Sequence, residues 1–382
     1  MEPIYLDHNA TTPIDPGVID AMAETARRFW ANPSSGHPPG LAAREELAKR
    51  RSVIARFIGA KPEEIIFTSG GTESDNLAVF GAARANQNKG RHLLISSIEH
   101  HAVLESCKVL SGQGFDVSHL PVDRDGRVDP DDVKKELRKD TVLVSVMHAN
   151  NEVGTVQPIA EIGRLVRERG VLFHTDAAQS VGKLPIHVDE LCVDLLTCSS
   201  HKIYGPKGVG FLYVRAGTNL SPLSYGGAQE GGFRSGTENL PGIAGLANAL
   251  ETAEKGMQKE GSLLAQLRDA LFEALSRSLD GIDLNGHMTS RLPGTLSLSV
   301  QGVKSSDLIT LLSQKGVFVS ASAACTTASI HPSHVLSAMG ISPSRAAGTL
   351  RISLGRSTRK EDLPYIADVL SSSVKQMRRR PS

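Results

Sequence analysis

Lys202 stands where a side-chain amine could act as a nucleophile or a base. It follows the apolar run 193–198 after three polar residues, and the chain is apolar again over 209–214. Asp176 closes an earlier apolar run, so a carboxylate and an amine follow two successive predicted strands. Since a lysine near a strand end can also be a solvated surface group, its role depends on what the other strands bring beside it.

Polar residues follow nearly every apolar run in the first two thirds of the chain. In a parallel α/β sheet, ligands bind beyond the carboxyl ends of the strands, so such residues are expected to share one site. The residues in these places are Gly70, Gly71, Thr72, Glu99, His100, Asn150, Asn151, Asp176, Gln179, Ser199, Ser200, His201 and Lys202.

Gly70 and Gly71 follow the run 64–69, and a predicted helix starts at Thr72. Glycines let the backbone approach an anion, and a helix N-terminus offers unpaired N–H groups, so a phosphate could bind here. Thr72 and Asp75 also have the spacing of a capping box, which would need no ligand. Without a Gly-Lys-Ser/Thr sequence or a well-placed G-x-G-x-x-G, neither a P-loop nor a dinucleotide site is indicated.

A cofactor with one phosphate, an acid partner and a lysine partner is pyridoxal phosphate. Its aldehyde condenses with a lysine amine, and its pyridine nitrogen needs a carboxylate to stay protonated. Lys202 and Asp176 fit these two tasks, because neighbouring strand ends lie about 4.8 Å apart. Lys207 is the competing lysine, but its Gly-Pro-Lys-Gly turn favours solvent exposure.

The remaining candidates each have a plainer alternative. His100 could stack on the cofactor ring or be a hydrogen-bonded residue at a helix start. Gln179 and Asn151 could donate to the ring oxygen or be ordinary turn residues. Ser199 and His201 could add phosphate donors.

These residues need an α/β scaffold to position them. Strands are expected at 64–69, 92–97, 141–148, 171–176, 193–198 and 209–214. Helical patterns at 72–85 and 99–113 alternate with them, which predicts a mainly parallel sheet with helices on both faces. After about residue 242 we expect helices at 243–257 and 262–279, strands at 295–300 and 316–322, and a last helix from 360.

The change of pattern predicts two domains. Residues 13–255 form a large cofactor-binding domain, and residues 1–12 with 256–382 form a smaller α+β domain. The chain has 382 residues, of which 40% are hydrophobic and 22% charged, as in ordinary globular proteins.

Bulk properties argue against several partners. With a net charge of +1, the chain has no overall electrostatic field that would attract nucleic acid or a membrane surface. The basic segment 375–380 is interpreted as a solvated chain end. The four cysteines form no C-x-x-C pair, so no zinc site is expected. No signal peptide and no apolar run of about 20 residues is found, so the expected location is the cytoplasm.

The same motifs resemble those of the cysteine desulfurases, pyridoxal phosphate enzymes of fold type I. The matching segments are YLDHNATTP (5–13), NPSS (32–35), SGGTES (69–74), EH (99–100), MHANNE (147–152), DAAQ (176–179), SSHKIYGPKG (199–208), RSGT (234–237) and RISLGR (351–356). They span nearly the whole chain.

This resemblance implies roles for individual residues. Gly71, Thr72, Ser199 and His201 match phosphate ligands, and Asp176 matches the pyridine partner. His100 matches the stacking histidine, and Asn151 and Gln179 lie near the ring oxygen. Thr237 would reach the cofactor of the second subunit of a homodimer. Arg351 matches the clamp for the substrate carboxylate, assisted by Asn32 and Asn151.

Cys325 lies in the small-residue run SASAACTTAS at 320–329, which resembles the long mobile loop of the class I desulfurases. The resemblance therefore implies that Cys325 takes sulfur from L-cysteine as a persulfide, leaves L-alanine, and passes the sulfur to an iron–sulfur scaffold or a thiolation enzyme. Lys202 would move the Cα proton, with help from His100. His331 and His334 could favour the Cys325 thiolate if they come close. A selenocysteine lyase and a fold-type-I aminotransferase remain alternatives, and the other three cysteines are expected to be structural.

Overall fold

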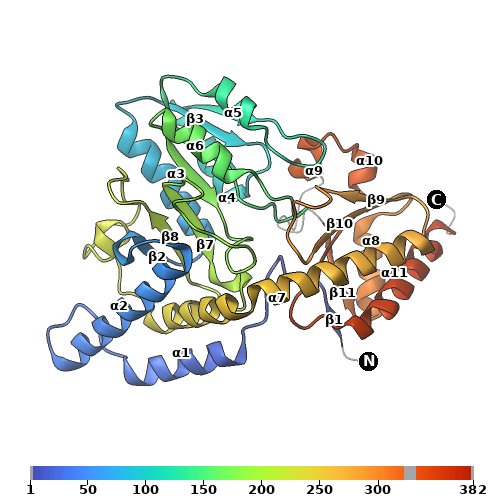
Figure 1. Cartoon of the computed structure of the whole chain (residues 1–382), viewed down its shortest axis with the longest axis horizontal. Helices are drawn as coiled ribbons and strands as arrows, with labels where there is room; N and C mark the ends of the chain where they lie inside the picture. Colours follow the sequence, from blue (N-terminus) through green and yellow to red (C-terminus); the bar gives the residue numbers. More distant parts are fainter. Residues whose placement is uncertain (1–2, 322–332, 380–382) are drawn as a thin grey trace.

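A computed structural model describes residues 3–321 and 333–379. Figure 1 shows a large body with a central sheet, a smaller body with its own sheet, and the helix α7 running through both. Cys325 and His331 lie outside the described residues.

The large body is built around a seven-stranded sheet in the order β2-β8-β7-β6-β5-β3-β4. β8 pairs antiparallel with both of its neighbours, and the pairs from β7 to β4 are parallel. The strands are β2 (Ile65–Thr68), β3 (His92–Ser96), β4 (Asp116–Leu120), β5 (Thr141–Ser145), β6 (Leu172–Asp176), β7 (Leu195–Ser199) and β8 (Gly210–Val214). The expected mainly parallel sheet is therefore present.

β4 is the one strand of this sheet that the sequence patterns do not predict. It lies at the edge and reads Asp-Val-Ser-His-Leu, with exposed or half-exposed residues at all positions but the last. An edge strand of this kind carries polar residues on its open side, so it lacks the apolar run that marks the central strands.

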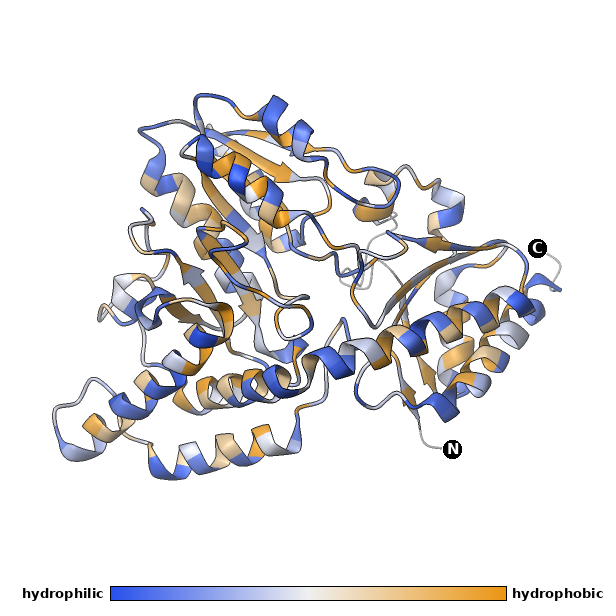
Figure 2. Ribbon diagram, in the orientation of Figure 1, coloured by the Kyte–Doolittle hydropathy of each residue, from blue (hydrophilic) through white to orange (hydrophobic). Residues whose placement is uncertain are grey.

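Helices cover both faces of the large sheet. One core cluster joins the sheet to α1, α2, α5, α6 and the first part of α7, and another joins the opposite face to α3 and α4. Figure 2 shows hydrophobic strands beneath helices whose outer faces are hydrophilic. The helices are α1 (Pro16–Arg28), α2 (Pro38–Ile58), α3 (Gly71–Asn86), α4 (His101–Gly112), α5 (Pro130–Glu136) and α6 (Ile159–Glu168), with the short turns η1 (Pro62–Glu64), η2 (Ser200–Lys202) and η3 (Glu230–Gly232).

The expectation of two helices at 243–257 and 262–279 is wrong, because α7 is one continuous helix, Leu240–Ser278. Gly256 and Gly261 cost about 1 kcal/mol each relative to alanine, which weakens a helix without ending it. Ile243 packs in the core of the large sheet and Leu271 in the core of the smaller body, so tertiary contacts hold both ends.

The smaller body contains a four-stranded antiparallel sheet in the order β12-β13-β10-β9, beside a parallel pair of β1 and β11. Its strands are β1 (Ile4–Tyr5), β9 (Ile282–Asn285), β10 (Thr295–Val300), β11 (Val317–Phe318), β12 (Ser320–Ala321) and β13 (Thr349–Ser353). Its helices are α8 (Ser305–Gln314), α9 (His334–Ala338), α10 (Pro343–Ala346) and α11 (Leu363–Arg378), with the turn η4 (Lys360–Asp362).

The hydrophobic core of the smaller body takes residues from both ends of the chain. Ile4 and Leu6 pack there with Leu271, Leu298 and Ile352. Both ends of the chain therefore contribute to this core, and the division into domains of residues 13–255 and of 1–12 with 256–382 stays a prediction. Within the described ranges, we find no helix with the length and apolar content needed to cross a membrane.

Candidate active site

A cavity of about 320 Å³ opens at the carboxyl ends of β6 and β7. It gathers most of the residues that the sequence analysis selected. Those that line it are Gly71, Thr72, His100, Asn151, Asp176, Gln179, Ser199, His201, Lys202 and Arg351. Segments that are far apart in the chain therefore meet at one site.

Lys202 and Asp176 reach this cavity from neighbouring strands. β6 ends at Asp176, and β7 is followed at once by η2, whose last residue is Lys202. The Lys202 Nζ donates to the carbonyl oxygens of Asn9 at 2.7 Å and Ala10 at 2.8 Å. Lys207, in contrast, is exposed. Lys202 is thus the lysine of this segment that is placed for chemistry in the cavity.

The Asp176 carboxyl group is buried beneath the site. Its Oδ1 accepts a hydrogen bond from the Ala178 N–H at 2.8 Å. Burial raises its pKa, while the neighbouring His100 and Lys202 pull the pKa down. A carboxylate in such surroundings is stabilised by a cation, and a protonated pyridine nitrogen is one.

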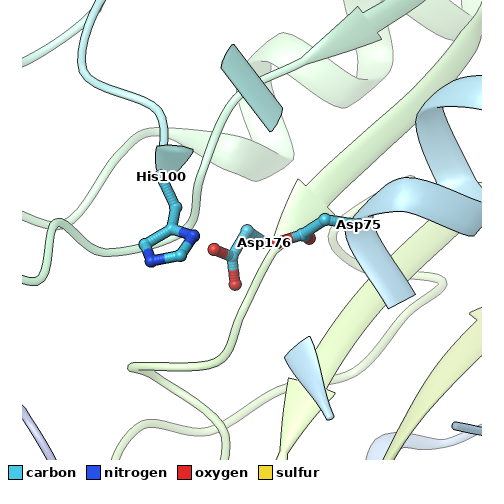
Figure 3. Close-up of side chains that lie close together, drawn as sticks. All are labelled: Asp75, His100 and Asp176. Carbon is cyan, nitrogen blue, oxygen red and sulfur yellow. The ribbon is translucent and has the colours of Figure 1, made fainter. Parts of the chain in front are cut away.

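His100 makes the helix-start hydrogen bond that was one of its two alternatives, and its stacking on a cofactor ring stays a prediction. It is the N-cap of α4, and its Nδ1 accepts from the Ala102 N–H at 3.2 Å. The ring also lines the cavity beside Asp176 (Figure 3). Burial lowers its pKa, so the imidazole is neutral near pH 7 and is suited to lie against an aromatic ring or to relay a proton.

An anion could bind at the N-terminus of α3. Gly70 is the N-cap with φ 148° and ψ −173°, a conformation that essentially requires glycine, and Gly71 and Thr72 line the cavity. Ser199 and His201 face the same space. Burial lowers the pKa of His201 to about 4, so its ring would act as a neutral hydrogen-bond donor.

The capping box of Thr72 and Asp75 does not form, because the helix begins earlier than that motif requires. Gly70 is the N-cap, and the Glu73 Oε2 accepts from the Ser69 N–H at 2.6 Å. Asp75 instead points inward and lines the cavity.

Gln179 connects two lysines at the back of the site. Its Nε2 donates to the Asn9 carbonyl at 2.9 Å, the same oxygen that Lys202 contacts, and its Oε1 accepts from the Lys183 Nζ at 3.3 Å. Burial lowers the pKa of Lys183 to about 7, and the nearby Lys202 charge makes a smaller contribution in the same direction. These contacts fix which way the Gln179 amide faces.

Arg351 enters the cavity from β13 of the smaller body. It is buried, its Nη2 donates to the Asp7 Oδ1 at 2.8 Å, and its Nη1 donates to the Asn151 carbonyl at 3.3 Å. The buried Nε has no hydrogen-bond partner among the described residues. Arg351 lines the cavity, and a guanidinium in such a place is suited to bind a carboxylate.

We expect Arg351→Lys to raise the KM for an amino-acid substrate about 10- to 100-fold with a smaller change in kcat, because a charge-assisted hydrogen bond contributes about 1.5–3 kcal/mol. Steady-state kinetics with L-cysteine will measure this. Arg356→Lys is the matched control, since Arg356 pairs with Asp15 and Glu260 and does not line the cavity. Equal effects of the two variants would contradict the assignment.

Three predicted site residues are not placed at the cavity in the described chain. Asn32 is exposed, and its Oδ1 accepts from the Ser34 N–H at 2.9 Å. Thr237 is exposed as well, as a contact to a second subunit would require. Cys325 lies outside the described residues. Their roles stay predictions.

The cysteines that the structure describes fit the structural role expected of them. Cys107 and Cys198 are buried, and burial raises both thiol pKa values, that of Cys107 to about 12. Cys192 is half-buried and donates to the Asp189 carbonyl at 3.4 Å. Neither buried thiol ionises near pH 7, which disfavours both as nucleophiles.

His334 does not supply the cation that the sequence analysis considered. Its Nε2 lies 2.9 Å from the Glu99 carbonyl oxygen, and burial lowers its pKa, so the ring is neutral near pH 7.

Several lining residues were missed from the sequence. Asn9 and Ala10 belong to the matching segment YLDHNATTP (5–13), but they follow no predicted strand of the large sheet and were not selected as site residues. Met147 lies at the end of an apolar run and looks like a core residue. Asp75 had a usable signal, because positions 72 and 75 lie on one face of a helix and Thr72 was already a candidate.

The donor set fits pyridoxal phosphate. The α3 N-terminus with Ser199 and His201 offers donors for a phosphate, Asp176 a buried carboxylate for the pyridine nitrogen, and Lys202 an amine for the aldehyde. The cavity of about 320 Å³ is large enough for such a group.

Comparisons with known proteins agree with this site. The family model described as Aminotransferase class-V matches residues 4–366. A cysteine desulfurase IscS of Dictyoglomus turgidum is 48% identical over 98% of this chain and 95% of its own length. A solved NifS-like protein has a TM-score of 0.92 at 38% identity, covering 98% of this chain and 100% of its own. A structure titled "SspA in complex with cysteine" has a TM-score of 0.83 at 38% identity, covering 92% and 99%.

These similarities extend over nearly the whole chain and include both bodies. They confirm the α/β fold of the NifS-like pyridoxal phosphate enzymes that the sequence motifs suggested. The chain therefore belongs to the class-V aminotransferase family and, within it, to the pyridoxal phosphate-dependent cysteine desulfurases.

Proposed function

We propose that this enzyme takes the sulfur atom from L-cysteine, leaves L-alanine, and passes the sulfur from Cys325 to an acceptor protein. The observation that carries this proposal is the single cavity that Lys202, Asp176 and Arg351 share. When bound there, pyridoxal phosphate supplies an electron sink for the substrate Cα and Cβ.

The residues of the chain bind the cofactor and transfer protons. Thr72, Ser199 and His201 hold the cofactor phosphate, and Asp176 holds the pyridine nitrogen. Lys202 holds the aldehyde in the resting enzyme and accepts the Cα proton when the substrate is in place.

The substrate is oriented by its carboxylate, which Arg351 binds through its fork of donors. Asn151 lines the cavity beside it, and its carbonyl already accepts from Arg351 at 3.3 Å. His100 would relay protons between substrate and solvent, a role that its neutral ring and its position at the cavity support.

Sulfur transfer needs a thiolate that can leave the cavity. The Cys325 thiolate attacks the substrate sulfur, an S–S bond forms, and the Cβ–S bond breaks. The electron pair of the broken bond passes to Cβ, which takes up a proton to give alanine. Placement in a run of small residues suits a nucleophile that meets first a substrate and then a protein acceptor.

A homodimer and an acceptor protein complete the proposal. Thr237 is exposed and lies outside the cavity of its own chain, which supports a contact with the cofactor phosphate of a second subunit. An iron–sulfur scaffold and a thiolation enzyme are the two acceptor classes that we propose.

Product analysis tests this function against its alternatives. With L-cysteine and a reductant, we expect equimolar L-alanine and sulfide. A keto acid in place of alanine would indicate an aminotransferase. Selenocysteine turned over much faster than cysteine would indicate a selenocysteine lyase. Either result would overturn the proposal.

A further inference from the structure

Asp75 is a buried acid in the cavity that the proposed chemistry does not use. It is 1% exposed and lines the same space as Asp176. Its Oδ1 is buried and has no hydrogen-bond partner in the described ranges. The Thr197 side chain hydrogen-bonds this carboxyl group, but burying a charged carboxylate is unfavourable unless a cation also pairs with it, so this position calls for an explanation.

The two carboxyl groups lie close together. A carboxylate oxygen of Asp75, a carboxylate oxygen of Asp176 and a ring nitrogen of His100 lie within 4.8 Å of one another. Figure 3 shows the Asp176 carboxyl group between His100 and Asp75, which projects from α3. Two like charges at this separation in a buried site disfavour each other, so the pair retains a proton.

The surroundings decide which of the two acids keeps the proton. The Lys202 charge and the hydrogen bond from the Ala178 N–H stabilise the charge on Asp176. The charged groups that act on Asp75 are Asp176 and Glu99, both acids, and its pKa is raised well above the ordinary value by burial and then by Asp176. Paired acids whose environments differ in this way take different protonation states.

His174 does not change this assignment. Its Nε2 lies 3.6 Å from the Asp75 Oδ1 and 3.1 Å from the Thr197 Oγ1. Burial lowers the pKa of His174 to about 3, so the ring is neutral and brings no positive charge to Asp75.

We propose that Asp75 is a positioning residue that holds its proton, so that the Asp75–Asp176 pair carries one negative charge, located on Asp176. The protonated acid then faces Asp176 as a hydrogen-bond donor, directly or through one water, and keeps that carboxylate ionised and directed at the pyridine nitrogen. This inference rests on the proposed role of Asp176.

The test compares Asp75→Asn, which keeps a neutral donor of the same shape, with Asp75→Ala, which removes it. Asp75→Asn should bind pyridoxal phosphate to the apoenzyme within about threefold of the parent affinity and keep its visible spectrum. Asp75→Ala should weaken this binding and lower kcat about tenfold each, with KM for cysteine little changed. An Asp75→Asn variant as damaged as Asp75→Ala would overturn the inference.

Infrared spectroscopy reads the proton directly and does not depend on turnover. The C=O stretch of a protonated carboxylic acid should be present in the parent enzyme and lost in Asp75→Asn. Burial raises the pKa values of Glu99 and Glu152 to about 7, and bands from these two acids are common to both proteins, so they cancel in the difference between the parent and Asp75→Asn spectra. An unchanged band would overturn the inference even if Asp75→Ala failed to fold.

The Asp176→Ala variant distinguishes a failure of the Asp75 inference from a failure of the proposed role of Asp176. If Asp176→Ala leaves the cofactor spectrum and activity unchanged, the proposed role of Asp176 fails. If Asp176→Ala is strongly impaired while Asp75→Ala matches the parent enzyme, the role of Asp75 alone fails.

Discussion

Lys202→Ala will lose the visible absorption of the lysine-bound cofactor and about 10³-fold or more of kcat. The reason is that one amine both holds the aldehyde and accepts the Cα proton, and a positioned acid–base group alone contributes about 10²- to 10⁴-fold. No other lysine amine is placed like that of Lys202, between the Asn9 and Ala10 carbonyls, in the described part of the chain. Absorption spectra and alanine release will measure both losses.

Lys207→Ala is the control for this variant. Lys207 belongs to the same segment and is exposed, so its loss should leave the spectrum and the rate near those of the parent enzyme. If Lys202→Ala keeps the lysine-bound absorption, or if Lys207→Ala loses it, Lys202 is not the lysine that holds the cofactor.

Cys325→Ala will keep the spectrum of the bound cofactor and lose essentially all sulfide release from L-cysteine. The two properties separate because cofactor binding depends on the cavity, whereas sulfur abstraction depends on a thiolate. Absorption spectra, sulfide assays and mass spectrometry of the persulfide will follow them in parallel.

Cys192→Ala controls for the loss of a thiol as such. Cys192 is half-buried beside the Asp189 carbonyl and does not line the cavity, so its removal should leave turnover unchanged. Full desulfurase activity in Cys325→Ala would refute the persulfide step.

Much of the site could be predicted because the pattern that marks it is local. Fully buried strands such as β5 and β7 are apolar runs, and a polar residue directly after such a run must lie at the edge of the sheet. Asp176 and Lys202 follow from this rule without knowledge of distant contacts. The confirmed fold and enzyme class rest on the same motifs.

What the sequence did not reveal depends on contacts between distant segments. Residues 1–12 were grouped with 256–382, but the pairing of Asp7 with Arg351 depends on the exact register of the packed segments, which the sequence patterns do not give. The continuity of α7 likewise depends on two cores that lie at its opposite ends. Asp75 was missed because one spacing fits both a helix cap and an inward-facing acid, and the start of the helix decides between them.

The helix α7 has 39 residues and is therefore about 58 Å long, at about 1.5 Å per residue. Lys202 belongs to the large body at one end of this helix, and Arg351 belongs to the smaller body at the other end. If α7 stays straight, the distance between these two bodies stays fixed, and Gly256 and Gly261 are the glycines in the middle of the helix, where helix propensity is lowest. Replacing both glycines with alanine would make α7 stiffer, and a change in substrate binding would then show that binding depends on bending of this helix.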